Sequence, residues 1–164
     1  GLQKQNKQDI GKVVNLGVMY RNGQGVTHDY KKAVEWYTKS AEQGYARGQY
    51  NLGVMYENGQ GVPKDPTIAA NWFRLAAEQG YAKAQFKLGY FYNLGLGVSK
   101  NLKTAFKWSK LAAEQGHGGA QANLGNMYLN GTGVAKDRKT AIKWYRLAAN
   151  QGNAYAKKRL KILQ

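Results

Sequence analysis

The chain of 164 residues lacks cysteine and has only nine acidic residues and two prolines. Without cysteine it has no disulfide framework, thiolate metal site or cysteine nucleophile. No segment approaches the roughly 20 apolar residues that a membrane-spanning helix needs, and the start "GLQKQNKQD" is too polar for a signal peptide. We therefore expect one domain that is soluble as given, with no transmembrane segment. Because the first residue is Gly rather than Met, the question of whether an export signal has been removed stays open.

Residues that carry catalysis are also scarce. His28 and His117 have no second His or Cys at metal-ligand spacing, and the three serines stand in no nucleophile motif. Three glutamates recur at a fixed interval, which indicates a structural role rather than an acid–base pair. We expect no enzymatic activity, metal site, cofactor or small-molecule substrate.

The positive charge is unevenly distributed. The net charge is +16, and residues 83–164 hold fifteen Lys and Arg against Glu114 and Asp137, whereas residues 1–82 hold ten against seven acidic residues. Such an excess of one sign is typical of proteins that bind nucleic acid, anionic polysaccharide or membrane surfaces. Any such binding would belong to the C-terminal half.

One motif returns four times at an interval of 36 residues, and periods of this size are typical of solenoid proteins. Its copies are "NLGVMYRNGQGV" at 15, "NLGVMYENGQGV" at 51, "KLGYFYNLGLGV" at 87 and "NLGNMYLNGTGV" at 123. All four tryptophans keep the same step: Trp36, Trp72, Trp108 and Trp144. A phosphate-binding loop would be needed once, so the four glycine-rich loops are interpreted as turns and not as ligand loops.

Each repeat has two segments with apolar residues at helical spacing, which predicts a helix–turn–helix unit. The second helix is expected to begin after an N-cap and to end before a left-handed glycine. The N-cap column holds Asp29, Asp65, Asn101 and Asp137, and the terminal glycines are Gly44, Gly80, Gly116 and Gly152. A further column, Gly17, Gly53, Gly89 and Gly125, lies inside the first helix. There we expect the partner helix to come too close for a Cβ.

The pattern "A-x-A-Q-x-x-L-G-x-x-Y-x-x-G-x-G-V" followed by "A-x-x-W-x-x-x-A-A-E-Q-G" resembles the Sel-1-like repeat family, which is related to the tetratricopeptide repeat. The resemblance implies an all-α, right-handed superhelical α-solenoid that serves as a scaffold for protein–protein interaction, without catalytic residues. Many bacterial members are secreted, periplasmic or host-directed. The resemblance therefore favours a periplasmic or secreted location, and a cytoplasmic one stays open.

The limits of the pattern predict the domain organisation. We expect a polar lead over residues 1–9, one solenoid domain over 10–153, and a C-terminal capping helix over 154–164. The repeats are expected at about 10–45, 46–81, 82–117 and 118–153. Lys161 stands where a helix glycine would be, so no second helix is expected to pack there. Because a polar cap blocks end-to-end association, we expect a monomer.

Positions that vary between repeats are where a partner could bind. In the first helices they fall on one helical face. This first-helix stripe is predicted to line a concave groove and to bind a protein or peptide: Arg47, Tyr50, Asn51, Val54, Lys83, Phe86, Lys87, Tyr90, Asn123 and Asn126. Aromatic residues beside cations are typical of interface hot spots. The alternative is that Phe86 and Tyr90 simply belong to the core.

The second helices carry a basic stripe in the last two repeats. Its members share one helical face in each repeat: Lys103, Lys107, Lys110, Lys139, Lys143 and Arg146. They could bind an anionic polymer such as cell-wall glycan, acidic lipid or nucleic acid, or they could be an ordinary solvated face. The first function predicted is thus a non-enzymatic adaptor, and the alternative is a binder of anionic polymers or surfaces.

Overall fold

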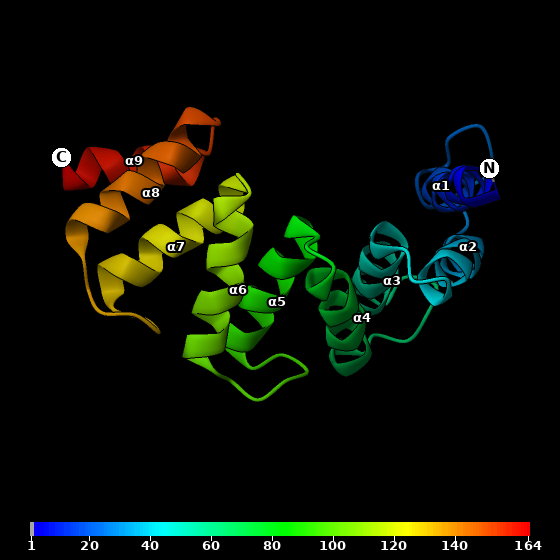
Figure 1. Cartoon of the computed structure of the whole chain (residues 1–164), viewed down its shortest axis with the longest axis horizontal. Coiled ribbons are helices and arrows are strands. Elements are labelled where there is room, and N and C mark those ends of the chain that lie inside the picture. Colours follow the sequence, from blue (N-terminus) through cyan, green and yellow to red (C-terminus); the bar gives the residue numbers. More distant parts are fainter. Residues whose placement is uncertain (1) are drawn as a thin grey trace. The chain divides into compact units, whose positions relative to one another are not determined.

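The computed structural model describes residues 2–164, with side chains from residue 11 onward, and this part of the chain is entirely helical outside its turns. Its nine helices are α1 (Leu2–Asn22), α2 (Tyr30–Glu42), α3 (Ala46–Asn58), α4 (Pro66–Glu78), α5 (Ala82–Leu94), α6 (Leu102–Glu114), α7 (Gly118–Asn130), α8 (Arg138–Asn150) and α9 (Ala154–Leu163). Four helix pairs followed by a terminal helix confirm the predicted α-solenoid (Figure 1).

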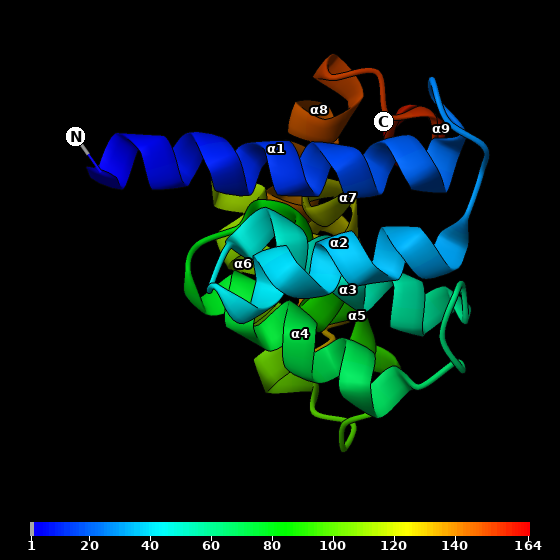
Figure 2. The ribbon, with the colours of Figure 1, turned by 90° about the vertical axis from the view of Figure 1, so that its right-hand side faces the viewer.

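Two compact units divide the chain, and each is described by itself. The N-terminal unit covers residues 1–79 and contains α1 to α4, each packed on the next. Figure 2 shows α1 lying along α2. One buried apolar cluster of this unit includes the ring of Tyr37 and joins α1, α2 and α3: Val14, Ala33, Tyr37, Ala41, Leu52 and Met55.

The C-terminal unit covers residues 80–164 and contains α5 to α9. In it α5 packs on α6, α6 on α7, α7 on α8, and α8 on α9 (Figure 1). One buried cluster lies between α6 and α7 around Leu124, and a second around Tyr145 joins α7, α8 and α9 through Ala156. The predicted terminal helix is thus seated on an apolar cluster of the last repeat.

The first helix is longer than its counterparts. The other first helices begin at residues 46, 82, 118 and 154, which places the equivalent position of α1 at residue 10. Instead α1 begins at Leu2, so the segment predicted as a polar lead continues the helix of the first repeat.

The predicted N-caps of the second helices are confirmed. Asp65 Oδ1 accepts a hydrogen bond of 3.1 Å from the backbone N–H of Ile68, and Asn101 Oδ1 accepts one of 3.0 Å from Thr104. Asp29 and Asp137 do the same for α2 and α8. Each bond satisfies a backbone donor that the first turn of a helix leaves unpaired. The repeat therefore fixes where each second helix begins.

The glycines inside the first helices mark close approaches, as predicted. A Cβ built on Gly53 would lie 2.7 Å from the ring of Phe73, and one on Gly125 would lie 2.7 Å from the ring of Tyr145. The ring of Tyr37 lies over Gly17 in the same way, and all three rings are fully buried. A side chain larger than hydrogen would push the ring away, so the glycine allows the two helices of a pair to pack around it.

Glutamine side chains connect successive repeats within each unit. Gln79 Nε2 donates to the carbonyl of Gly44 at 3.0 Å and to Gln49 Oε1 at 2.8 Å. In the C-terminal unit Gln115 and Gln151 make the equivalent pairs of bonds, one to a glycine carbonyl of the preceding repeat and one to a glutamine of their own repeat. The acceptors Gln49, Gln85 and Gln121 are buried, and these bonds satisfy polar atoms that would otherwise destabilise the core.

The glycine-rich segments are turns that touch the preceding repeat. Gly59 and Gly61 have φ values of 64° and 74°, which few residues other than glycine adopt. A Cβ on Gly61 would lie 2.6 Å from the backbone oxygen of Tyr30, at the start of α2. Val62 packs against the core cluster of the unit. The geometry accounts for both glycines by backbone conformation and packing.

Candidate functional site

The third repeat departs from the packing rule of the others. The column that supplies the buried rings reads Tyr37, Phe73, Ser109 and Tyr145. Over Gly89, therefore, lies a serine side chain instead of an aromatic ring. A cavity of about 270 Å³ opens at this place, which we call the Ser109 hollow. Its lining residues are Gly89, Tyr90, Asn93, Ser109, Asn123, Asn126, Met127, Asn130 and Thr132.

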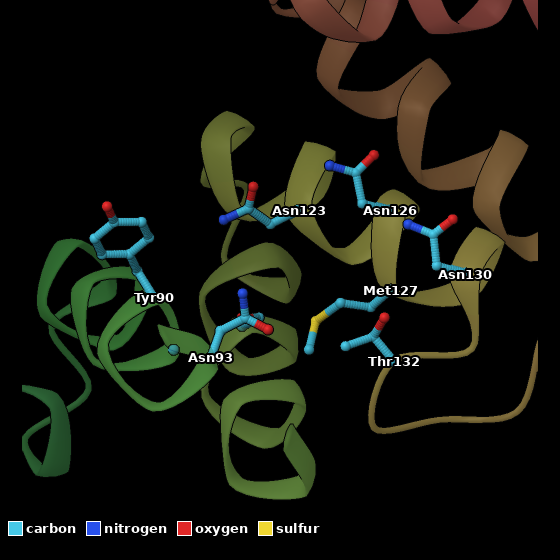
Figure 3. Close-up of a pocket in the computed structure, with 9 residues that line it drawn as sticks. Tyr90, Asn93, Asn123, Asn126, Met127, Asn130 and Thr132 are labelled. Carbon is cyan, nitrogen blue, oxygen red and sulfur yellow. The ribbon is translucent and has the colours of Figure 1, made fainter. Parts of the chain in front are cut away.

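The Ser109 hollow is lined by the first helices α5 and α7, by Ser109 on α6, and by the turn that follows α7. Tyr90 and Asn93 lie on α5, whereas three asparagines and Met127 lie on α7. Figure 3 shows Asn93 and Met127 facing each other from opposite sides. Tyr90 is 41% exposed, so the rim is accessible. The hollow thus combines the apolar side chain of Met127 and the ring of Tyr90 with amide groups that can donate and accept hydrogen bonds.

One asparagine of the hollow is fixed in orientation by two tyrosines. The hydroxyl groups of Tyr145 and Tyr155 both donate to Asn126 Oδ1, the second at 2.8 Å. Burial raises the pKa of Tyr145, and the hydrogen bond from Arg159 partly offsets this rise, so the phenol stays protonated at neutral pH. Since the oxygen of Asn126 is occupied twice, its amide N–H groups are the part left to face a ligand.

Several residues of the predicted first-helix stripe lie on this hollow, and others lie elsewhere. Tyr90, Asn123 and Asn126 line it. Val54, predicted to line the concave groove with the rest of the stripe, is buried at 9% exposure in the N-terminal unit. In the same unit the ring of Tyr50 lies 5.7 Å from that of Phe73, and the guanidinium of Arg47 donates to Asn15 Oδ1 at 3.1 Å. Asn51 is partly buried there, as is Lys87 in the C-terminal unit.

Phe86 and His117 form a stacked pair beside the stripe, with ring centroids 4.6 Å apart. Phe86 also packs against the apolar cluster between α6 and α7. His117 Nδ1 accepts a hydrogen bond of 3.0 Å from the backbone N–H of Ala120, so a neutral imidazole caps α7. Burial and the nearby ammonium of Lys83 lower the pKa of His117, which favours this neutral form.

The predicted basic stripe is exposed along its whole length on α6 and α8. Lys110 Nζ lies 4.0 Å from Glu114 Oε1, and Lys107 Nζ lies 5.5 Å from the ring centre of Trp108. The ion pair is exposed and contributes little to stability, and the ring of Trp108 carries no charge, so the stripe keeps its positive charge. Among the described residues, no three His, Asp or Glu side chains gather to hold a metal ion.

Sequence reasoning missed the residue that creates the hollow. Ser109 entered only as a serine without a nucleophile motif, and Asn93 and Thr132 were not singled out. A signal was present, since Ser109 is the one small residue in a column of Tyr and Phe at the interval of 36. The sequence alone does not show that the side chains of this column pack on the glycines inside the first helices. Without that knowledge, the cavity beside Ser109 could not be inferred.

Helix pairs at a constant interval, joined by repeated side-chain bonds, define a helical-repeat protein of the solenoid class. The family model described as "Sel1 repeat" matches residues 14–45, 46–81, 82–117 and 119–153. The chain therefore belongs to the Sel1 repeat family, as the sequence predicted. Proteins of this family are typically non-enzymatic scaffolds for protein–protein interaction.

Solved structures agree with this assignment. A protective antigen of uropathogenic Escherichia coli with an SLR fold is 39% identical over 96% of this chain and 34% of its own, with a TM-score of 0.90. A Sel1 repeat protein from Oxalobacter formigenes is 41% identical over 92% of this chain and 60% of its own, with a TM-score of 0.87. This chain thus spans about a third and three fifths of their lengths.

A more distant relative is cysteine-rich protein B of Helicobacter pylori, which is 27% identical over 81% of this chain and 96% of its own, with a TM-score of 0.64. No curated protein sequence matches the chain. Within residues 2–164, none of the helices combines the length and apolar character needed to cross a membrane.

Proposed function

We propose that this chain is a non-enzymatic adaptor that binds an extended segment of a protein partner at the Ser109 hollow. The observation that carries the proposal is a formed cavity on the variable stripe, lined by asparagine amides and an exposed tyrosine. Asparagine donates and accepts at once, which matches the alternating groups of an extended peptide backbone. Family membership supports the same general role.

The size and rim of the hollow favour a peptide segment over a free small molecule. At about 270 Å³ the cavity is smaller than most sites that enclose a drug-sized ligand, but it can hold one large side chain. Tyr90 stands at its rim, and tyrosine provides contact area at low entropic cost. A segment that crosses the stripe would place one side chain in the hollow and its backbone against the asparagines.

A random peptide library displayed on phage can test the proposal without a known partner. Selection on the wild-type chain should yield peptides that bind at least tenfold more weakly to Asn126→Asp, which keeps the acceptors for Tyr145 and Tyr155 but removes the N–H donors. The matched control is Asn71→Asp, the same change at an exposed position of α4 in the N-terminal unit. If no selected peptide distinguishes the two variants, the hollow is not the peptide site.

A second candidate function is the binding of an anionic polymer through the basic stripe of α6 and α8. It is favoured by the fifteen basic and two acidic residues of the C-terminal half and by the exposure of all six stripe residues. Heparin and double-stranded DNA serve as probes. Because such binding releases counterions, affinity should fall steeply between about 50 mM and 200 mM salt. Affinity that hardly changes with salt would exclude this function.

A further inference from the structure

We propose that the Ser109 hollow receives an aromatic side chain of the partner, which takes the place that the chain's own ring fills in the other repeats. This inference rests on the proposed function and names the residue that is recognised. The repeats themselves provide the template, because the hollow is compared with three filled copies of the same site in one chain.

The filled copies show what fits over a helix glycine. Phe73 lies over Gly53 and Tyr145 lies over Gly125, and both rings are fully buried. Each ring belongs to the second helix of its pair and packs against backbone that carries no Cβ. Gly89 keeps the same bare backbone, yet its partner is the hydroxyl of Ser109, 2.5 Å from a built Cβ. In the third repeat the hydroxyl group of Ser109 thus stands in place of the ring, and the cavity lies beside it, lined by both Gly89 and Ser109.

The residues around the Ser109 hollow suit an aromatic side chain supplied by a partner. Met127 lies in the wall, and a thioether makes favourable contacts with aromatic rings. Asn93 and Thr132 also line the cavity, where they can bond a phenolic hydroxyl or the backbone beside it. An aliphatic side chain would forgo the contact between ring and thioether and would leave the amides without partners.

Asn126 fixes how the incoming segment is oriented. Because Tyr145 and Tyr155 occupy its oxygen, its amide presents donors only, and these hydroxyl bonds polarise the amide further. A backbone carbonyl next to the inserted ring is the complementary acceptor. The recognised element is therefore an aromatic residue followed or preceded by a free main-chain carbonyl, on a segment in extended conformation.

Charge complementarity adds a preference for acidic segments. The C-terminal half carries a net charge of +13, with Glu114 and Asp137 as its only acidic side chains. Acidic residues that flank the aromatic residue would speed association and suppress basic competitors. The partner segment is thus expected to be an acidic stretch that contains a tyrosine or phenylalanine.

The decisive experiment is an NMR titration of the ¹⁵N-labelled full chain with p-cresol and toluene, which stand for the side chains of Tyr and Phe. Methylcyclohexane is the aliphatic control. The aromatic probes should shift the backbone resonance of Gly89 and the side-chain amides of Asn93 and Asn126. Methylcyclohexane should bind at least tenfold more weakly. Equal shifts for all three probes, or none at Gly89, would overturn the inference.

Ser109→Phe provides the matched loss-of-site variant, because it restores the residue type of the other repeats. The shifts at Gly89 should disappear in this variant. Shifts of unchanged size would contradict the inference. The reciprocal variant, Phe73→Ala, should open a second cavity and add shifts at Gly53; if it does not fold, Ser109→Phe still decides.

Peptides separate failure of this inference from failure of the proposed function. In a peptide that Asn126→Asp weakens, replacing its aromatic residue by leucine should reduce affinity at least tenfold. If such peptides carry no aromatic residue, or tolerate leucine, the hollow still binds peptides but does not recognise a ring. If no peptide responds to Asn126→Asp, the proposed function itself fails.

Discussion

Phe73 over Gly53 and Ser109 over Gly89 are the same place in two repeats, one filled and one open. In the N-terminal unit the ring is fully buried, whereas in the C-terminal unit a cavity with asparagines around it lies where the ring is missing. The fold tolerates both because caps, glutamine bonds and turns are retained in each repeat. A position that holds a buried core ring in one repeat can therefore hold a small residue in another, where it leaves a cavity for a ligand.

The largest difference in the free energy of unfolding is expected between the variants Phe73→Ala and Ser109→Ala. Phe73→Ala removes a fully buried ring and should lower the free energy of unfolding by about 3–5 kcal/mol. Ser109→Ala loses no ring and should change it by less than about 1 kcal/mol. Urea denaturation followed by circular dichroism measures both. Equal losses would mean that the two positions are not equivalent in packing.

Filling the hollow should have a smaller effect of opposite sign. Ser109→Phe places a ring over Gly89 as in the other repeats, and filling a cavity typically adds about 0.5–2 kcal/mol to the free energy of unfolding. The midpoint of thermal unfolding should rise accordingly. A fall would show that the asparagines of α7 are packed too closely to admit a ring, and the comparison with Phe73 would then fail.

The smallest effect is a pH dependence at the cap of α7. The folded pKa of His117 is lowered below its ordinary value of about 6.5, because burial and then Lys83 disfavour the charged imidazole. The stability that this cap contributes is therefore fully present above about pH 6.5, and it is lost as the pH falls through the folded pKa. The loss should not exceed the roughly 1 kcal/mol of one N-cap.

His117→Asn is the matched control for this prediction. Asn153 occupies the same column and caps α9 through a bond of 2.9 Å from Ala156, without a titrating group. The variant should keep the cap and lose the difference in stability between about pH 5.5 and 7.5 that the histidine causes. An identical pH profile for both chains would assign the dependence to other groups.

The repeat made most of the fold predictable from sequence. Asp65 and Asn101 could be recognised as N-caps because local chemistry decides a helix start, and Gly53 could be recognised as a close approach because glycine is costly inside a helix. The start of α1 at Leu2 was not predicted, because the polar residues before Ile10 show no apolar residues at helical spacing. A helix that continues from a packed segment does not need such a pattern.

The candidate site was only partly predictable. Tyr90, Asn123 and Asn126 were identified because they vary on one helical face, but the pattern could not separate exposed from buried members. Val54 is buried and Phe86 stacks on His117, and both facts depend on neighbouring helices. The hollow itself arises from a residue that is absent, and a missing ring becomes visible only when the packing of the other copies is known.

The glutamine bonds between repeats have a consequence for how such a chain can change in length. Each bond to a glycine carbonyl spans 35 residues and joins two repeats, whereas each bond to a glutamine spans 30 residues within one repeat. The second and third repeats therefore each carry both the glutamine donor and the glycine carbonyl acceptor by which neighbouring repeats connect. Duplicating or deleting one unit of 36 residues leaves the inter-repeat bonds intact. Recombination can therefore copy, move or remove a repeat together with the cavity that its Ser109 position creates.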